Sequence, residues 1–204
     1  MNSREFILDA VRRNQPAARP LPDVPRFEGP TGNLLASFSA ALERMGGTLA
    51  MPPADGALDS FLAQRFPQAR VICSATPEVL GTRAISAVKD PRELQDVDVG
   101  VVRAVFGVAE TGSVALSDRE FGVNALGFLS QHLVVLLDPQ AIVANLHDAY
   151  GRAGFFDANY AVLMTGPSAT ADIEGVLVRG AQGIRSLTVI PVALPQPANT
   201  LQAP

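Results

Sequence analysis

The stretch Val97–Leu116 reads VDVGVVRAVFGVAETGSVAL. It is rich in valine and glycine and contains no block of strong helix-forming residues. Valine is β-branched and favours the extended backbone of a strand, whereas a segment such as Glu110-Thr111-Gly112 favours a turn. We therefore predict two strands, over residues 100–108 and 113–116, joined by a tight turn that contains this tripeptide.

Short apolar segments and helical segments alternate on both sides of this stretch. Apolar runs bounded by turn residues predict buried strands, and apolar residues at helical spacing predict helices that cover a sheet. The predicted strands are 48–51, 69–73, 133–137, 160–164 and 187–192. The predicted helices are 33–45, 57–66, 139–152 and 171–178, with a further helix start at 76–78 and a short helix or loop at 124–129. This alternation predicts a three-layer α/β/α fold with a mostly parallel central sheet.

The N-terminal segment has a different character from the rest of the chain. Residues 1–13 have the apolar spacing of an amphipathic helix. Its inward face is expected to comprise Phe6, Ile7, Ala10 and Val11. Prolines recur through residues 14–32, and because proline lacks an N–H and restricts φ, this stretch is expected to be an extended connector. We therefore divide the chain into an N-terminal helix with a Pro-rich connector, residues 1–32, and a single α/β domain, residues 33–204.

The overall composition argues against several classes of function. The 204 residues contain one cysteine, Cys73, which by itself can form neither an internal disulfide nor a cysteine-ligated iron–sulfur cluster. The net charge is −4 and the arginines are scattered, so no basic stripe indicates nucleic-acid binding. The longest clean apolar run, Leu133–Leu137, is far shorter than the about 20 residues of a membrane span. With a lone thiol and no signal-peptide pattern, we expect a cytoplasmic protein.

The segment Thr165–Glu174 reads TGPSATADIE and directly follows a predicted strand. With a helix expected from residue 171, the loop Gly166-Pro167-Ser168 would present backbone N–H groups to an anion at the carboxyl edge of the sheet. Gly166, and Gly112 in the first segment, would let the backbone approach a ligand closely. This reading makes the loop a ligand-binding site.

A simpler interpretation of the same segment is that it only begins a helix. Ser168 or Thr170 would then cap the helix, and Asp172 and Glu174 would complement its dipole. If the two carboxylates instead face a ligand, they favour a cation or a hydroxyl-rich molecule, because they would repel an anion. Both interpretations predict a helix after the loop.

The turn of the first segment contains the candidate catalytic residue, Glu110. Its apolar flank predicts partial burial, which raises the pKa of a carboxyl group and suits general acid–base chemistry. A solvent-exposed turn residue is the alternative. The neighbouring hydroxyls of Thr111 and Ser113 would donate hydrogen bonds either to a ligand or to the backbone of the turn.

The remaining chemically versatile residues carry weaker signals. Two distant histidines, His132 and His147, lack the spacing of a metal site, so none is predicted. Cys73 ends a predicted buried strand and is expected to be a small core residue. Arg103 and Arg119 flank the first segment, where either can bind a carboxylate or simply face solvent.

A family resemblance emerges from two segments taken together, Phe106–Leu116 and Thr165–Glu174. Followed by Gly180, Gly183 and the strand at 187–192, they resemble the LUD domain of the lactate-utilisation protein C family. The order and spacing agree over residues 97–192. The resemblance implies a fold similar to that of the CoA-transferase and ribose-5-phosphate-isomerase group. It also implies a role in oxidising L-lactate to pyruvate alongside partner proteins that carry iron–sulfur clusters, with no cofactor in this chain.

The chain departs from the family pattern at Val102, Ala169, Gln182 and Ile184, where the family often has Thr, Arg, His and Pro. Three functions remain open. The first is an accessory subunit of an L-lactate-oxidising system that binds a small molecule such as a hydroxy acid. The second is a stand-alone CoA-transferase-like enzyme that uses Glu110. The third is a non-catalytic, ligand-binding regulatory module.

Overall fold

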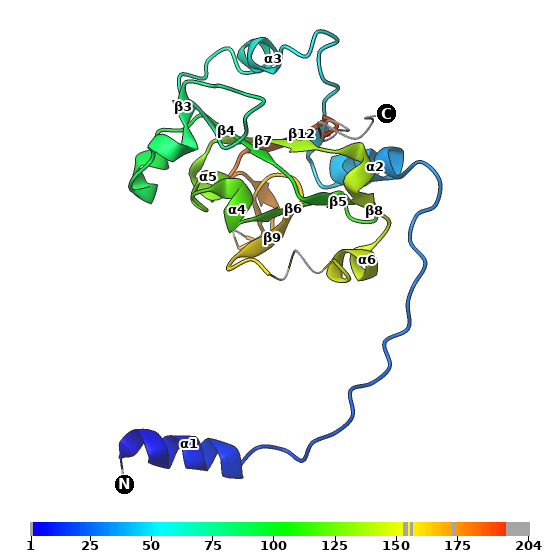
Figure 1. Cartoon of the computed structure of the whole chain (residues 1–204), viewed down its shortest axis with the longest axis vertical. Coiled ribbons are helices and arrows are strands. Elements are labelled where there is room, and N and C mark those ends of the chain that lie inside the picture. The colour runs from blue at the N-terminus through cyan, green and yellow to red at the C-terminus, as the bar shows by residue number, and fades with distance from the viewer. Residues whose placement is uncertain (1, 153–154, 156, 173, 195–204) are drawn as a thin grey trace, which may run out of the picture.

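The core of the protein is a six-stranded sheet in which every neighbouring pair of strands is parallel (Figure 1). The computed structural model describes residues 2–152, 155, 157–172 and 174–194. The strands, in their order across the sheet, are β1 (Thr48–Leu49), β12 (Ser186–Pro191), β7 (His132–Leu137), β4 (Val99–Arg103), β2 (Ile72–Ser74) and β3 (Arg83–Ala84). The predicted three-layer α/β fold with a mostly parallel central sheet is confirmed.

The two faces of this sheet are covered by different layers. Side chains alternate between the faces of a strand, so Val99 and Val101 of β4 join one apolar cluster while Val102 joins another. Helix α3 (Leu58–Arg65) covers the first face with Leu58 and Leu62. The second face packs against helices α2 (Leu34–Arg44), α4 (Asp118–Phe121) and α5 (Leu126–Leu129) and against a smaller sheet.

The smaller sheet contains four strands in the order β8 (Ile142–Val143), β5 (Phe106–Val108), β6 (Ser113–Ser117) and β9 (Ala161–Met164). Strand β6 is antiparallel to both of its neighbours, whereas β8 runs parallel to β5. The face of the smaller sheet that points away from the large sheet packs against helix α6 (Leu146–Tyr150) through Ala149. Figure 1 shows α3 and α6 at opposite ends of this stack of layers.

The prediction of one strand over residues 100–108 is wrong, because the chain changes sheets within it. The N–H of Ala104 donates to the carbonyl oxygen of Leu136 in the large sheet, at 2.8 Å, whereas the N–H of Val105 donates to Ala115 in the small sheet, at 2.9 Å. Adjacent residues therefore bond to different sheets. An unbroken run of valines is compatible with either arrangement, since both sheets bury strand residues of this type.

The helix predicted over residues 139–152 is also wrong in its middle. A 3₁₀ turn, Pro139–Ala141, leads into β8, and α6 begins only after Asn145, whose side chain accepts a hydrogen bond from the N–H of Asp148 at 2.9 Å. The β-branched pair Ile142 and Val143 satisfies its backbone on β5 instead of within a helix.

The predicted helix start at 76–78 is absent from the structure, in which these residues form a bend and a turn. The other short elements are the 3₁₀ turns Ile85–Ala87 and Pro91–Leu94 and the strands β10 (Ala169–Thr170) and β11 (Val178–Arg179).

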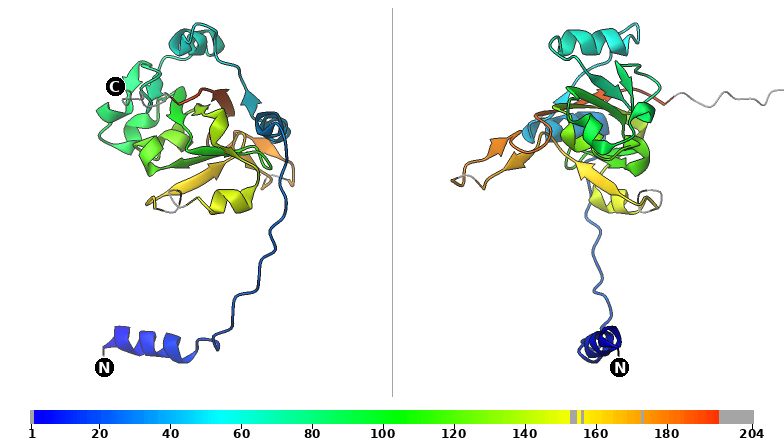
Figure 2. Two further views of the ribbon diagram at one scale, coloured as in Figure 1. Left: turned by 45° about the vertical axis from the view of Figure 1, so that its right-hand side comes forward. Right: turned by 90° about the vertical axis from the view of Figure 1, so that its left-hand side faces the viewer.

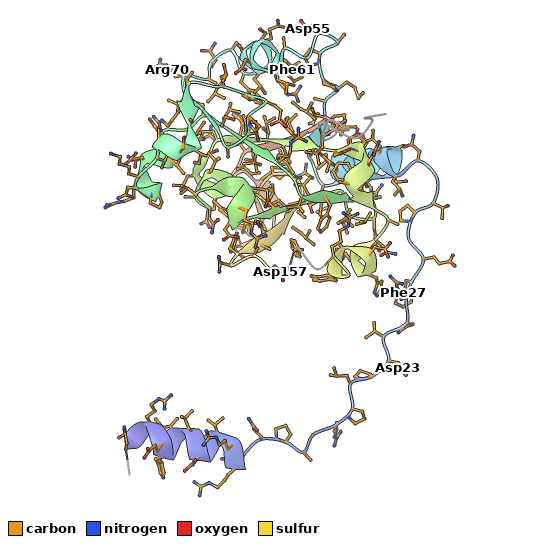
Figure 3. All side chains as sticks on the ribbon, viewed as in Figure 1. Asp23, Phe27, Asp55, Phe61, Arg70 and Asp157 are labelled. Atoms are coloured by element: carbon orange, nitrogen blue, oxygen red, sulfur yellow. The ribbon has the colours of Figure 1, made fainter. Side chains whose placement is uncertain are left out.

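The N-terminal helix α1 (Ser3–Arg13) lies apart from the α/β body at the end of an extended connector (Figure 1). The prediction that Phe6, Ile7 and Val11 face inward is wrong, because they are 59%, 58% and 54% exposed. Figure 3 shows Asp23 on the connector well away from the body, and Phe27 near its lower edge. Over the residues that the structure describes, no helix has the length and apolar character needed to cross a membrane.

Candidate functional site

The two conspicuous sequence segments meet at the C-terminal end of helix α2. Gly112 has φ +69°, and a Cβ there would lie 2.5 Å from the Cα of Leu42. Gly166 has φ +67°, and a Cβ there would lie 2.5 Å from the carbonyl oxygen of Met45. The glycines therefore allow close approach to the helix backbone. Close approach of these glycines to a ligand stays a prediction.

A chain of hydroxyl groups joins the two segments at this point. The hydroxyl oxygens of Thr111 and Ser113 lie 2.7 Å apart, and the Ser113 hydroxyl is also hydrogen-bonded to that of Thr165. Ser113 is only 5% exposed, at the start of β6, and Thr165 follows β9 directly. Thr111 and Ser113 were predicted to bond either a ligand or the turn backbone, and the structure shows them bonded to one another.

A cavity of about 350 Å³ opens beside these hydroxyls. It is lined by Ala41, Arg44, Met45, Glu110, Thr111, Ser113 and Thr165. Arg44 stands in the last turn of α2 and is exposed, and the ion pairs found within the described residues leave its guanidinium without a carboxylate. A guanidinium binds a carboxylate through two parallel hydrogen bonds, and hydroxyls beside it can bond a second polar group. The cavity thus suits a small molecule with a carboxylate and a hydroxyl.

Glu110 lies at the rim of this cavity and is exposed, which corrects the prediction of partial burial. Burial along the strand ends at Ala109, which is 1% exposed, because the turn carries the next residue out of the sheet. One carboxylate oxygen of Glu110 accepts a hydrogen bond from the N–H of Leu146 at 3.1 Å, at the start of α6. The side chain is therefore oriented by α6 and accessible to solvent.

The second segment does not begin a helix, so the predicted anion site at a helix N-terminus is wrong. Among the described residues of 171–178 none is helical, and the chain forms an antiparallel hairpin of β10 and β11. Two successive residues, Glu174 at φ +54° and Gly175 at φ +69°, are left-handed and reverse the chain. Figure 2 shows this hairpin (orange) projecting from the body.

The residues of the second segment separate into two groups. Gly166, Pro167 and Ser168 line a neighbouring groove of about 220 Å³, which shares Thr165 with the first cavity. The hydroxyl of Thr170 accepts a hydrogen bond from the N–H of Asp172 at 3.3 Å within the hairpin. Asp172 and Glu174 are exposed and line neither this groove nor the cavity at the end of α2.

Besides the apolar Ala41 and Met45, sequence reasoning missed two polar residues of the site, Arg44 and Thr165. Both stand at the ends of correctly predicted elements, since α2 confirms the helix predicted over 33–45 and β9 the strand predicted over 160–164. Nothing in the local pattern indicates that these two ends meet. Only the packing of the turn onto α2 brings them together.

Two of the remaining candidates have structural roles. Cys73 is fully buried in the core, as predicted, and burial raises the pKa of its thiol. Arg103 forms an ion pair with Glu78, and its Nη1 donates to the carbonyl oxygen of Val192 at 3.0 Å. These two groups are therefore engaged within the protein rather than offered to a ligand.

Two more candidates lie at the surface, and the fifth, His132, lines a separate cavity. Arg119 donates to the carbonyl oxygen of Asp157 at 3.0 Å, and His147 lies against the ring of Phe27 with ring centroids 5.8 Å apart. Among the residues that the structure describes, no group of three His, Cys, Asp or Glu side chains is placed to hold a metal ion.

The departures from the family pattern lie in different environments. Val102 and Ile184 are buried in the main core, where apolar side chains pack well. The carbonyl oxygen of Gln182 accepts a hydrogen bond from the Ser168 hydroxyl, while Ala169 is exposed at the start of the hairpin. Only Gln182 and Ile184 line the groove beside the candidate site.

Comparison with known proteins agrees with this architecture. The family model of the LUD domain matches residues 80–192, more than half of the chain. A crystal structure of a DUF162 family protein from Deinococcus radiodurans is similar to it with a TM-score of 0.58 and 17% sequence identity, covering 80% of this chain and 100% of that one. No curated protein matches the chain. The matched range includes both segments of the predicted resemblance, which is confirmed. The chain therefore belongs to the LUD domain family, which is associated with lactate utilisation.

Proposed function

We propose that this protein is an accessory subunit of a system that oxidises L-lactate to pyruvate, and that it binds L-lactate in the cavity at the end of α2. The family's association with lactate utilisation supports the general role. The observation that carries the proposal is that Arg44, which forms no ion pair among the described residues, lines the same cavity as the hydroxyl-bearing residues Thr111, Ser113 and Thr165. Lactate has one carboxylate and one hydroxyl on adjacent carbons, which matches this pairing of groups.

In this proposal the residues of the chain bind and orient lactate. Arg44 holds the carboxylate, and the Ser113 hydroxyl network bonds the lactate hydroxyl. Glu110, at the rim, is placed to accept a proton. The cavity of about 350 Å³ exceeds the volume of lactate and leaves room for part of a partner protein.

Oxidation of lactate to pyruvate removes two electrons and two protons, so an electron acceptor is needed. A single buried cysteine cannot ligate an iron–sulfur cluster. We therefore assign the acceptor role to iron–sulfur clusters on partner proteins, with no cofactor on this chain. The proposal also places the protein in the cytoplasm, where a lone thiol stays reduced.

Replacement of Arg44 with glutamine is expected to weaken L-lactate binding about tenfold, because a charge-assisted hydrogen bond contributes about 1.5–3 kcal/mol. Isothermal titration calorimetry on the full chain measures this directly. Arg19→Gln is the matched control, since Arg19 is exposed on the connector and lines none of the cavities described. Equal binding by the two variants, or no L-lactate binding by the wild-type chain, would remove Arg44 from the site.

The assembly itself is tested by mixing the protein with co-purifying iron–sulfur proteins. We expect L-lactate oxidation only in the complete mixture, and a loss of it with Arg44→Gln but not with Arg19→Gln. Acyl transfer between CoA and a carboxylic acid by the isolated chain, abolished by Glu110→Gln, would instead identify a CoA-transferase-like enzyme. Lactate binding without any effect on oxidation would indicate a regulatory module.

A further inference from the structure

A second and larger cavity, of about 440 Å³, opens at the amino ends of the central strands β4, β7 and β12. Its walls include Arg65, Phe66, Gln68, Asp98, His132 and Arg185. None of these residues lines the cavity at the end of α2. The loop after α3 forms one wall, and the starts of β7 and β12 form the other. This cavity has no part in the function proposed above.

The charged groups of this cavity are mostly positive. Among the ion pairs that the described residues form, none includes Arg65 or Arg185, and Arg65 makes only a cation–π contact, 6.0 Å from the Phe66 ring centroid. The one carboxylate, Asp98, accepts hydrogen bonds from the N–H groups of Arg70 and Val71 at 2.7 and 2.9 Å. These bonds hold the pKa of Asp98 below its usual range and tie its charge to the backbone.

His132 lines the same cavity, and two contacts orient its ring. Its Nδ1 is 2.8 Å from the hydroxyl oxygen of Ser186, and its ring centroid is 5.1 Å from that of Phe66. With Nδ1 occupied by Ser186, Nε2 is left to bond a ligand. Desolvation, assisted by the positive charge of Arg185, lowers the pKa of His132, while Asp98 opposes this shift. An imidazole held in this way, in a cavity that Arg65 and Arg185 also line, is an arrangement that an anion would stabilise.

We propose that this cavity is a second ligand site, which binds a small organic anion carrying a carboxylate or phosphate group. Arg65 and Arg185 hold the anionic group, His132 donates one further hydrogen bond to it, and the ring of Phe66 contacts the organic part. A cavity of about 440 Å³ lies within the range of small-molecule sites and is larger than a single inorganic ion requires. Carboxylates and phosphates each offer a pair of oxygens that can accept two parallel hydrogen bonds from a guanidinium.

The first test titrates the full chain with citrate and, separately, with inorganic phosphate at millimolar concentration by isothermal titration calorimetry. We expect at least one of the two to bind, and each of Arg65→Gln and Arg185→Gln to weaken binding about tenfold. The stronger of the two titrations identifies the preferred anionic group.

Two control variants separate this site from general electrostatics. Arg70→Gln removes a positive charge from the same loop without altering the lining of the cavity, and Arg19→Gln removes one from the connector, which lines neither cavity. Both should leave citrate and phosphate binding within about twofold of wild type, because a surface charge contributes little to a contact it does not make. Loss of binding in all four variants alike, or no binding of either anion, would overturn the proposal.

The ionisation of His132 supplies an independent check by NMR. Replacement of Arg185 with glutamine removes a neighbouring cation, so the pKa of His132 should rise. A bound anion stabilises the imidazolium and should raise the same pKa further in the wild-type chain, so anion affinity should increase as the pH falls through it. A pKa of His132 that stays constant on addition of citrate and phosphate would show that neither anion enters the cavity.

Discussion

Replacement of Gly112 with alanine is expected to destabilise the protein by about 3 kcal/mol. A left-handed backbone costs a residue with a side chain about 1–2 kcal/mol, and Gly112 has φ +69°. In addition, its new Cβ would lie 2.5 Å from the Cα of Leu42 and closer still to the Leu42 nitrogen. Because these are backbone atoms of α2, they cannot move aside as a flexible side chain would, and such overpacking costs about 1–3 kcal/mol.

The matched control for this variant is Gly56→Ala. Gly56 has the same φ of +69°, but no atom lies within 4 Å of its Cβ position. Urea unfolding should therefore show a loss of about 1 kcal/mol for Gly56→Ala, from backbone strain alone. Equal losses for the two variants would mean that the turn is not packed against α2. A larger loss for Gly112→Ala confirms the contact that brings Arg44 to Thr111 and Ser113.

Replacement of Arg103 with methionine is expected to destabilise the protein by about 3 kcal/mol, the lower end of the range for breaking a buried ion pair. Arg103 and Glu78 have side chains that are only 15% and 20% exposed. The Arg103 guanidinium donates to the carboxylate of Glu78, with Nε 2.8 Å from Oε1, and to the carbonyl oxygen of Val192. Its loss leaves the Glu78 carboxylate without a counter-charge, while Oε2 of that group has no hydrogen-bond partner in the described structure.

Two further variants show whether the unpaired carboxylate causes this loss. Arg92→Met breaks an exposed pair, with Arg92 88% exposed, and should leave the free energy of unfolding in urea almost unchanged, because solvent screens such a pair. Adding Glu78→Met to Arg103→Met removes the unpaired charge and should recover part of the stability. If the double variant is less stable than Arg103→Met by as much as Glu78→Met alone destabilises the wild-type protein, the two side chains act independently.

The predicted elements that hold in the structure are those in which local pattern and burial agree. The apolar runs that became β7 and β12 are central strands, and such strands are buried on both faces. Helix α2 begins after Asn33, whose side chain accepts a hydrogen bond from the N–H of Ala36 at 3.1 Å. Its apolar spacing and its cap both lie within one short segment, so both can be recognised there.

The wrong predictions concern segments whose local pattern fits more than one environment. The valine-rich run of residues 100–108 suits either of two sheets, and the change from one to the other at Val105 depends on which partner strand is near. The apolar residues of 171–178 have helical spacing, but Val176 and Leu177 are exposed in the hairpin. Left-handed geometry at Glu174 and Gly175 overrides that spacing.

The candidate site divides in the same way. Glu110, Thr111 and Ser113 could be named from their segment, because a short turn between strands must place its polar side chains near one point. Arg44 lies far earlier in the chain, and it shares a cavity with them because Gly112 packs against α2. The second cavity likewise joins the loop after α3 to the starts of β7 and β12.

The amino-acid sequence by itself determined the parallel α/β class, the helix at 33–45, the LUD family and the hydroxyl-rich turn. The helix and the turn depend on patterns within a few tens of residues, where backbone preference and side-chain periodicity act directly. The fold class and the family depend on the order of such segments along the chain. The tertiary structure alone decided that Arg44 shares a cavity with that turn, that the second segment is a hairpin, and that Arg65, Arg185 and His132 share another cavity. These features arise from packing between distant segments, whose free energy depends on which surfaces meet and not on the pattern of either segment alone.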